Sequence, residues 1–216
     1  MAVIDWRLYL VTSGDGPATV RAAAAAAAAG AGVVQVRAKH LLAGELLELV
    51  LDVASAVADV APDTRVLVND RADVAHAARR RGAPVHGVHL GQADLPVGEA
   101  RALLGADALV GLTAGTLDHV REAGARTGAH RPDYLGSGPF RPTPTKDVGR
   151  PPIGLAGYPL RTAATQLPVV AIGDVTLADV APLSRTGVAG VAVVREVMGA
   201  ADPGAAAAAC LRAWAS

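Results

Sequence analysis

The stretch from Asp133 to Lys146, DYLGSGPFRPTPTK, combines backbone freedom with polar side chains in the way that a phosphate group requires. Gly136 and Gly138 let a ligand approach the backbone closely, and three prolines restrict the loop to few conformations. Hydroxyl groups and a positive charge that suit phosphate oxygens come from Thr143, Thr145 and Lys146. We therefore expect a phosphate-binding loop. The alternative is an ordered surface loop built of turn-forming residues.

A second polar set lies in the segment VVQVRAK, residues 33–39. Gln35, Arg37 and Lys39 are spaced by two, so on an extended strand they share one face, while Val34 and Val36 lie on the other. Polar groups that face the interior of a fold are costly unless they meet partners or a ligand. The spacing predicts an anion-binding face, and the alternative is a structural network of ion pairs.

Carboxylates follow two further strand-like segments, with Asp70 in VNDRADVA and Asp94 in GVHLGQADLP. Two carboxylates near cations suit one Mg²⁺ that also binds water and a substrate phosphate. Asn69 stands beside the first aspartate, and Thr113 follows the next apolar segment. For each aspartate the alternative is an N-cap of the helix that follows.

Eight apolar segments alternate with eight helical segments along the chain. The predicted strands are residues 6–11, 33–36, 65–68, 87–90, 108–112, 134–136, 169–172 and 188–194. The predicted helices are residues 17–29, 43–61, 71–81, 97–104, 117–127, 160–166, 177–185 and 203–214. Apolar strands that alternate with helices are typical of a parallel sheet covered on both faces. Eight such units predict an α/β fold, the (β/α)8 TIM barrel, rather than an open doubly wound sheet.

No linker or change of composition divides the chain, so we expect residues 1–216 to form a single domain. In a TIM barrel the active site lies at the carboxyl ends of the strands, where all the polar residues named above fall. Gly173 and Val194 follow the last two strands, a position at which barrels commonly bind phosphate through backbone amides. Two anionic substrates are therefore expected.

Composition excludes several other classes of protein. Twenty basic and twenty acidic residues cancel, which argues against nucleic acid or an anionic membrane as a partner. The single cysteine, Cys210, excludes an internal disulfide and a thiolate zinc site, and its apolar setting predicts a core residue. His86 and His89 are three apart on a strand, hence on opposite faces, and do not suggest a shared metal. Without a basic leader or a long apolar run, the chain is expected in the cytoplasm; a homo-oligomer is compatible with it.

Six segments, in order and at predicted strand ends, resemble the thiamine phosphate synthase family over nearly the whole chain. They are residues 33–39, 68–75, 87–96, 133–146, 168–174 and 187–194. The resemblance implies a barrel enzyme of thiamine biosynthesis that uses Mg²⁺. It joins hydroxymethylpyrimidine diphosphate to a thiazole phosphate, and it releases pyrophosphate.

The resemblance also implies roles for individual residues. The pyrimidine diphosphate would contact Gln35, Arg37, Lys39, Asn69, Thr113 and Lys146, of which Arg37, Lys39, Thr113 and Lys146 are the catalytic set. The metal ligands would be Asp70 and Asp94. The thiazole phosphate would contact Thr143, Thr145, Gly173, Val194 and Arg195.

The chain departs from the family pattern at Ala38, Gly115, Asp174 and Arg195. Ala38 replaces an acid, Gly115 a histidine, Asp174 the second glycine of a phosphate-binding pair, and Arg195 a small residue. Our hypothesis is that Asp174 and Arg195 face each other across adjacent strand ends and alter the thiazole phosphate half of the site. The alternatives are a paralogue that acts as a thiazole tautomerase or a non-catalytic binder, and an unrelated phosphate-binding isomerase.

Overall fold

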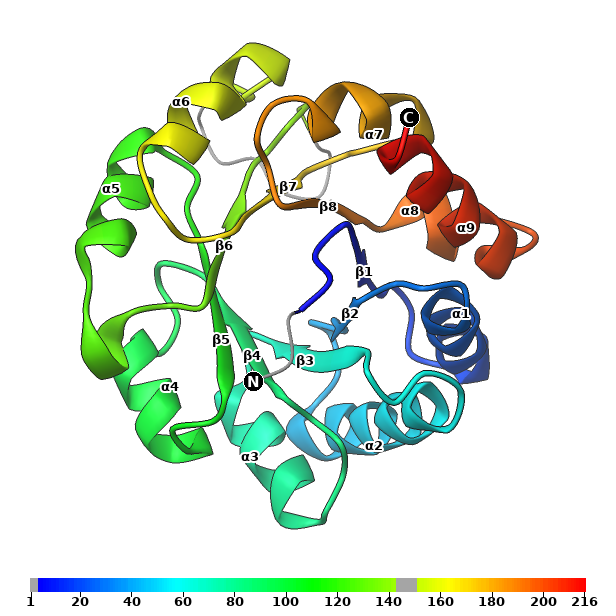
Figure 1. Ribbon diagram of the computed structural model, residues 1–216. Helices are drawn as coiled ribbons and strands as arrows, with labels where there is room; N and C mark the ends of the chain where they lie inside the picture. The colour runs from blue at the N-terminus through cyan, green and yellow to red at the C-terminus, as the bar shows by residue number, and fades with distance from the viewer. Residues whose placement is uncertain (1–3, 143–150) are drawn as a thin grey trace.

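The structure, a computed structural model, describes residues 4–142 and 151–216. Eight parallel strands close into a barrel in the order of the sequence, and helices surround it (Figure 1). The strands are β1 (Leu8–Val11), β2 (Val33–Val36), β3 (Arg65–Asn69), β4 (Gly87–Leu90), β5 (Leu109–Thr113), β6 (Tyr134–Ser137), β7 (Val169–Ile172) and β8 (Gly190–Val193). The predicted α/β fold, a (β/α)8 TIM barrel, is confirmed.

Within residues 4–142 and 151–216, the outer ring contains the helices expected from the sequence together with three short ones that were not predicted. The expected helices are α1 (Pro17–Ala28), α2 (Ala43–Val60), α3 (Ala72–Arg80), α4 (Val97–Leu104), α5 (Leu117–Ala125), α6 (Tyr158–Ala163), α7 (Leu177–Ser184) and α9 (Pro203–Trp214). The additional ones are α8 (Arg195–Met198) and the 3-10 helices η1 (Gly128–His130) and η2 (Leu155–Gly157). Each of the three is too short to show a helical period in the sequence.

Three predicted elements were wrong by more than one residue at their starting end. β8 begins at Gly190 rather than Val188, because its pairing with β7 starts at the Val170–Gly190 pair. β1 begins at Leu8 rather than Trp6, because its pairing with β8 starts at the Leu8–Val191 pair. α6 begins at Tyr158 rather than Leu160, since Pro159 is well placed in a first helical turn, and it ends at Ala163 rather than Gln166. The end of β8 at Val193 leaves Val194 as the N-cap of α8.

Side chains alternate between two cores along each strand. The interior of the barrel holds an inner core that includes Tyr9, Val33, Leu67, Leu109 and Tyr134. Val34 and Val36 face the larger core between the strands and the helices. The period of two therefore turns Gln35 into the barrel, as predicted.

The packing of the helical ring explains the alanine run of α1 and confirms the predicted burial of Cys210. Alanines of α1 are buried where this helix packs beside α2 and α9, so the alanine run serves close packing (Figure 1). Cys210 is buried in α9, and this burial raises the pKa of its thiol to about 11. None of the helices in the described ranges is long and apolar enough to cross a membrane.

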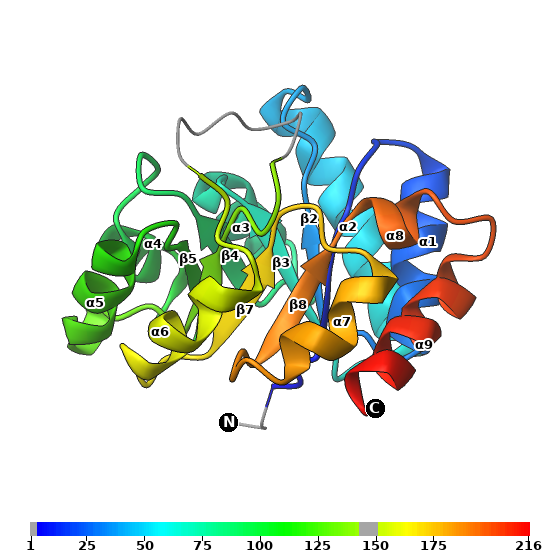
Figure 2. The same cartoon turned by 90° about the horizontal axis from the view of Figure 1, so that it is seen from above.

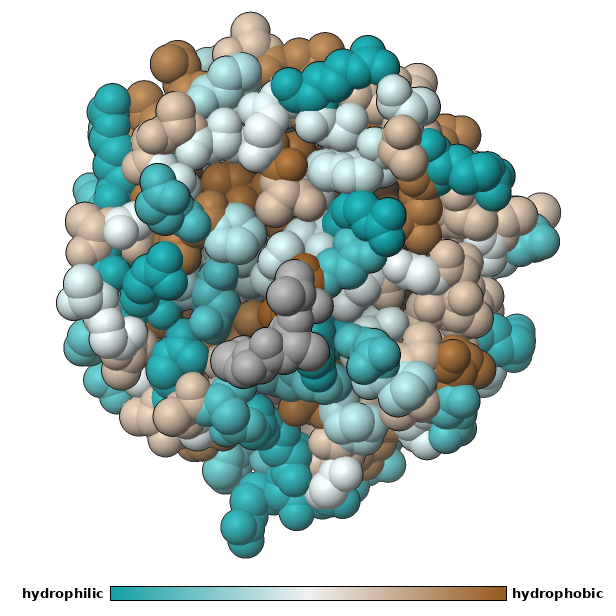
Figure 3. All heavy atoms as spheres, viewed as in Figure 1, coloured by the Kyte–Doolittle hydropathy of each residue, from teal (hydrophilic) through white to brown (hydrophobic). Residues whose placement is uncertain are grey.

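The two ends of the barrel differ in what they carry. In the side view, the loops that follow the strands gather along one rim (Figure 2). Figure 3 shows the opposite face, where hydrophilic and apolar side chains are interspersed around the starts of the strands. In a TIM barrel this starting end serves stability, whereas the other end carries the active site.

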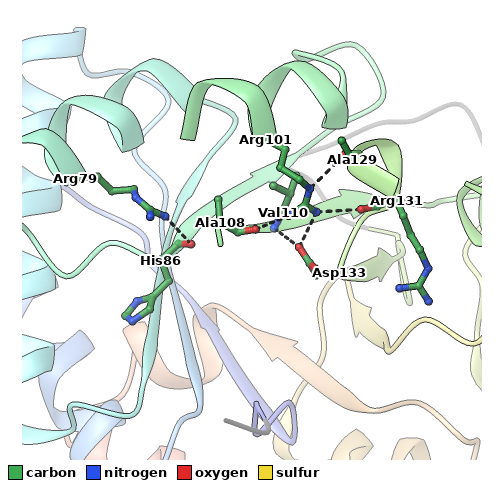
Figure 4. A network of polar contacts seen from close by, with 8 residues as sticks. All are labelled: Arg79, His86, Arg101, Ala108, Val110, Ala129, Arg131 and Asp133. Atoms are coloured by element: carbon green, nitrogen blue, oxygen red, sulfur yellow. Dashed lines mark hydrogen bonds and ion pairs between the residues drawn. The ribbon is translucent and has the colours of Figure 1, made fainter. Parts of the chain in front are cut away.

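A polar network at the starts of β5 and β6 is centred on Arg101 and Asp133 (Figure 4). The Asp133 carboxylate accepts hydrogen bonds from Arg101 at 3.0 Å and from the Val110 N–H at 2.7 Å. Arg101 also donates to the backbone oxygens of Ala108, Ala129 and Arg131. Asp133 thus lies outside the expected phosphate-binding region, even though it begins the sequence stretch that predicts it.

We expect Asp133→Ala to lower the free energy of unfolding by about 2–4 kcal/mol, because it leaves the Arg101 charge and the Val110 amide without their acceptor. Only 12% of the Arg101 side chain is exposed, so water replaces the carboxylate poorly. Asp118→Ala is the matched control, since it removes an exposed partner of Arg121 and is expected to cost less than about 1 kcal/mol. Urea unfolding of the three proteins measures both changes, and equal losses would contradict the prediction.

His86, just before β4, predicts a pH dependence of stability. Burial, together with the positive charges of Arg65 and Arg79, lowers the pKa of His86 to about 4. Its Nδ1 accepts a hydrogen bond from the Val66 N–H at 3.0 Å, which requires that nitrogen to be unprotonated. As the pH falls, His86 in the unfolded chain therefore binds a proton near pH 6.5, whereas His86 in the folded chain binds one only at a lower pH.

We expect the contribution of His86 to the free energy of unfolding to be fully present above pH 6.5 and to be lost as the pH falls toward 4. Because His86 is partly exposed, the loss should be about 1–2 kcal/mol. His86→Asn keeps an acceptor for the Val66 amide without the titration. Unfolding free energies measured between pH 4 and 7 should therefore slope less steeply in the variant. Identical slopes would show that His86 does not contribute.

Candidate functional site

The carboxyl ends of β2 and β3 bring two predicted cations to one side of the barrel mouth. Lys39 pairs with Asp70, with 2.7 Å between Nζ and Oδ2. The Arg37 backbone N–H donates to Thr12 Oγ1 at 3.0 Å, which anchors the chain at the end of β2. Among the residues that the structure describes, no carboxylate pairs with the partly buried Arg37 guanidinium. A cation held at a mouth without an anion is well suited to an anionic ligand.

Asp70 has a backbone conformation that is rare for its residue type. Its φ is 62°, a region that side chains other than glycine seldom adopt. The Arg71 N–H donates to the Asn69 oxygen at 2.7 Å, and the Asp70 N–H donates to the His89 oxygen at 2.8 Å. Such strain persists where the surrounding structure enforces it, often at functional sites. The tight turn directs the Asp70 carboxylate toward Lys39.

The N-cap alternative is wrong for both aspartates. α3 begins after Arg71 and α4 after Pro96, so neither Asp70 nor Asp94 occupies the cap position. Asp94 instead accepts a hydrogen bond from the Gly91 N–H at 2.6 Å through Oδ2. Both carboxylates line one pocket of about 270 Å³ together with Lys39 and Asn69.

The two carboxylates shift each other's protonation in opposite directions. Burial raises the pKa of Asp70, but hydrogen bonds with Lys39, Asp94 and Asn69 and the charge of Lys39 together outweigh burial, and the pKa lies below its usual value. Burial raises the pKa of Asp94 and the neighbouring Asp70 adds to the rise, against the opposing Gly91 hydrogen bond, so this pKa lies above its usual value. Asp70 and Asp94 therefore carry more negative charge than the single neighbouring cation, Lys39, can neutralise.

The Asp70 and Asp94 carboxylates suit Mg²⁺ better than they suit a metal ion whose ligands all come from protein side chains. The described residues contain no group of three or more His, Cys, Asp or Glu side chains that could hold a metal. Mg²⁺ usually keeps several waters and takes one or two carboxylates together with substrate phosphates. Asp70 and Asp94 provide that number of carboxylates.

A buried chain of polar side chains crosses the barrel beneath the mouth. Gln35 and Thr113, both predicted site residues, stand at its two ends, and between them lie Tyr9, Tyr134 and His89. The sequence interpretation missed these three as site residues. The available signal was strand alternation, because His89 lies between Val88 and Leu90, which face the core between the strands and the helices.

The ends of β6, β7 and β8 form the other side of the mouth. Gly173 has φ 109°, and a Cβ there would lie 2.6 Å from Pro139 Cα, so only glycine lets the β6 loop approach. The Arg141 N–H donates to the Gly173 oxygen at 3.1 Å. The glycine-rich loop after β6 therefore lies against the expected phosphate position after β7.

The predicted contact between Asp174 and Arg195 is confirmed. Arg195 Nη2 donates a hydrogen bond to Asp174 Oδ1, and the two side chains form an ion pair between the ends of β7 and β8. Asp174 has φ 58°, so a side chain occupies a backbone position that favours glycine. Arg141 joins this group, since its Nη1 donates to the Asp174 backbone oxygen at 3.2 Å while its guanidinium pairs with Asp179.

The other residues predicted from the sequence are Val194, three residues of the loop after β6, and two histidines. Val194 caps α8 directly after β8, next to Arg195. Thr143, Thr145 and Lys146 lie outside the described residues, so their predicted roles stay predictions. His86 and His89 point to different surroundings, one to the Val66 backbone and the other into the barrel, as predicted.

The sequence of this chain matches one protein family and several curated proteins over most of its length. The family described as thiamine monophosphate synthase matches residues 8–197. A thiamine-phosphate synthase of Corynebacterium efficiens is 54% identical over 200 residues, covering 92% of this chain and 90% of that protein. One from Corynebacterium jeikeium is 54% identical over 202 residues, covering 94% and 91%.

A solved structure agrees with the sequence relatives. The thiamine phosphate pyrophosphorylase from Pyrococcus furiosus superposes with a TM-score of 0.84 at 28% identity, and the match covers 98% of this chain and 96% of that one.

Proposed function

This chain belongs to the thiamine monophosphate synthase family, and we propose that it joins hydroxymethylpyrimidine diphosphate to a thiazole phosphate, forming thiamine phosphate and pyrophosphate. In this reaction the bond between the pyrimidine methylene carbon and the diphosphate oxygen breaks, and a bond from that carbon to the thiazole nitrogen forms. The observation that carries the proposal is the cluster at the mouth: Arg37, which pairs with no carboxylate in residues 4–142 and 151–216, with Lys39 and the adjacent Asp70 and Asp94.

The pyrimidine diphosphate would lie over β2 to β5. Arg37, Lys39 and the Thr113 hydroxyl would bind the diphosphate oxygens, together with Lys146 from the loop after β6. Gln35 and Asn69 would orient the pyrimidine ring through their amides. These groups hold a poor leaving group in one position while its negative charge grows, which is where fixed positive charge is most effective.

Asp70 and Asp94 would hold Mg²⁺. When bound, the ion would supply positive charge to the departing pyrophosphate. The Lys39–Asp70 pair orients one of these carboxylates in advance, and the Gly91 amide orients the other. Both carboxylates are therefore preorganised by contacts that the chain itself provides.

The thiazole phosphate would lie over β7 and β8. The backbone near Gly173 and Val194 and the side chain of Arg195 would contact it, with Thr143 and Thr145 from the preceding loop. Because Arg195 is already paired with Asp174, this half-site offers less free positive charge than an arginine alone would supply.

The alternative of a thiazole tautomerase or a non-catalytic binder is not favoured, because close relatives over most of the chain are named as synthases. Small-molecule substrates follow from the family. Cytoplasmic location, the absence of nucleic-acid and membrane partners, and any homo-oligomer stay predictions from the sequence.

The test is release of pyrophosphate from hydroxymethylpyrimidine diphosphate with Mg²⁺, with and without thiazole phosphate, followed by mass analysis of the product. Thiamine phosphate that forms only when both substrates and Mg²⁺ are present would support the proposal. Binding of the diphosphate without any product under either condition would contradict it.

A further inference from the structure

A single line of hydrogen bonds connects Gln35 on β2 with Thr113 on β5 through the barrel interior. Gln35 Nε2 donates to Tyr9 Oη at 2.6 Å, and Tyr9 Oη lies 2.7 Å from Tyr134 Oη. Tyr134 Oη lies 2.8 Å from His89 Nδ1, and His89 Nε2 lies 3.0 Å from Thr113 Oγ1. The line joins the residue proposed to orient the pyrimidine with a residue proposed to bind the diphosphate.

The orientation of Gln35 determines the direction of every hydrogen bond in the line. Because Tyr9 Oη accepts from Gln35, the Tyr9 proton is free to donate to Tyr134, and the Tyr134 proton then donates to His89 Nδ1. A histidine that accepts at Nδ1 carries its proton on Nε2, so His89 donates to Thr113 Oγ1. Among the residues that the structure describes, the Thr113 proton and Gln35 Oε1 have no other partner, so the proton is available to an acceptor at the mouth and the amide oxygen to a ligand.

The surrounding sequence makes room for this line. A Cβ on Gly111 would lie 2.2 Å from Tyr134 Cζ, and a Cβ on Gly136 would lie 2.8 Å from His89 Cε1. The Tyr134 ring therefore requires glycine on the neighbouring strand β5, and the His89 ring requires glycine on β6, two strands away across the barrel interior. Tyr9 and Tyr134 are 2% and 0% exposed, and burial raises both phenol pKa values well above the usual range, so both remain hydrogen-bond donors.

We propose that Tyr9, Tyr134 and His89 are positioning residues that form one proton-ordered chain. It presents the Gln35 carbonyl to the pyrimidine and the Thr113 hydroxyl proton to the diphosphate at the same time. The proposal rests on the proposed function for the identity of the ligand. The tautomer of His89 that it requires does not depend on any ligand.

The first experiment therefore uses the full chain without substrate. Nitrogen NMR of the protein labelled in its histidines, with His89→Gln to assign the signals, reports which ring nitrogen carries the proton. We expect the proton on Nε2 of His89 in the unmodified chain and a shift toward Nδ1 in Tyr134→Phe, which removes the donor to Nδ1. A proton on Nδ1 in the unmodified chain overturns the proposal.

Tyr158→Phe is the matched control. Tyr158 is also fully buried, and its hydroxyl donates to the Ser137 backbone oxygen at 3.0 Å, outside the line. We expect the His89 signals to be unchanged in this variant. A similar shift in both variants would show that loss of any buried phenol perturbs His89, which also overturns the proposal.

The second experiment is a double-mutant cycle on pyrophosphate release. Thr113→Val removes the Thr113 hydroxyl. Tyr134→Phe is expected to turn the Thr113 hydroxyl proton inward toward His89 Nε2, so each variant should lower kcat/KM by about 10-fold or more. The double variant should be within about threefold of Thr113→Val alone, because both changes remove the same donated proton. Losses that multiply would overturn the proposal. If the unmodified chain released no pyrophosphate, the proposed function would fail while the His89 tautomer still decided this inference.

Discussion

Asp70→Asn is expected to lower kcat/KM for pyrophosphate release by about 100-fold or more. The change removes one of the two carboxylates proposed to hold Mg²⁺, and it leaves Lys39 without the partner that now lies 2.7 Å away. The residue shape is kept, so the strained turn at φ 62° should persist, and asparagine tolerates that region comparatively well. The loss should therefore come from charge rather than from folding.

The measurement is pyrophosphate release over a range of Mg²⁺ concentrations, together with calorimetric titration of Mg²⁺ in the presence of the diphosphate substrate. We expect Asp70→Asn to need far more Mg²⁺ for half-maximal rate and to show weaker binding. Asp73→Asn is the control, since that aspartate lies three residues away and pairs with Arg71 at the exposed surface. Full activity of Asp70→Asn at unchanged Mg²⁺ would rule out the assignment.

The sequence predicts the barrel because its signals are local and repeated. Each strand is a mostly apolar segment, and the period of two along β2 turns Gln35 inward and Val34 and Val36 outward. The positions of Asp70 and Asp94 at strand ends follow from the same pattern. Once eight units are recognised, closure of the barrel brings these residues to one mouth.

The rest depends on distances across the barrel, which local patterns do not contain. Tyr9 and Tyr134 are 125 residues apart, and nothing in either strand indicates that the two hydroxyls meet. Asp133 begins the stretch that is predicted to bind phosphate, but β6 separates it from the mouth by the length of the strand. The left-handed backbone at Asp70 is likewise a product of the contacts around it rather than of its residue type.

The Asp174–Arg195 pair is the feature by which this chain should differ most from relatives with a glycine and a small residue at these positions. The Arg195 side chain is 66% exposed, so the pair contributes little to folding, and its main effect falls on a ligand. Asp174 is 26% exposed and lies where a phosphate is proposed to bind. The arginine attracts that phosphate and the aspartate repels it, so the two effects oppose each other.

We expect Arg195→Ser to raise the KM for thiazole phosphate by about 10-fold, because the Asp174 carboxylate would then face the phosphate without a neutralising cation. Asp174→Gly should lower that KM or leave it unchanged, since it frees Arg195 and relaxes the backbone at φ 58°. The double variant should return to within about threefold of the unmodified chain, because the attractive and the repulsive charge are removed together. Steady-state kinetics with thiazole phosphate, and with the unphosphorylated thiazole alcohol as the control substrate, measure these differences. If the double variant were as impaired as Arg195→Ser, Asp174 would not act on the phosphate, and the pair would be a surface contact without a role in substrate binding.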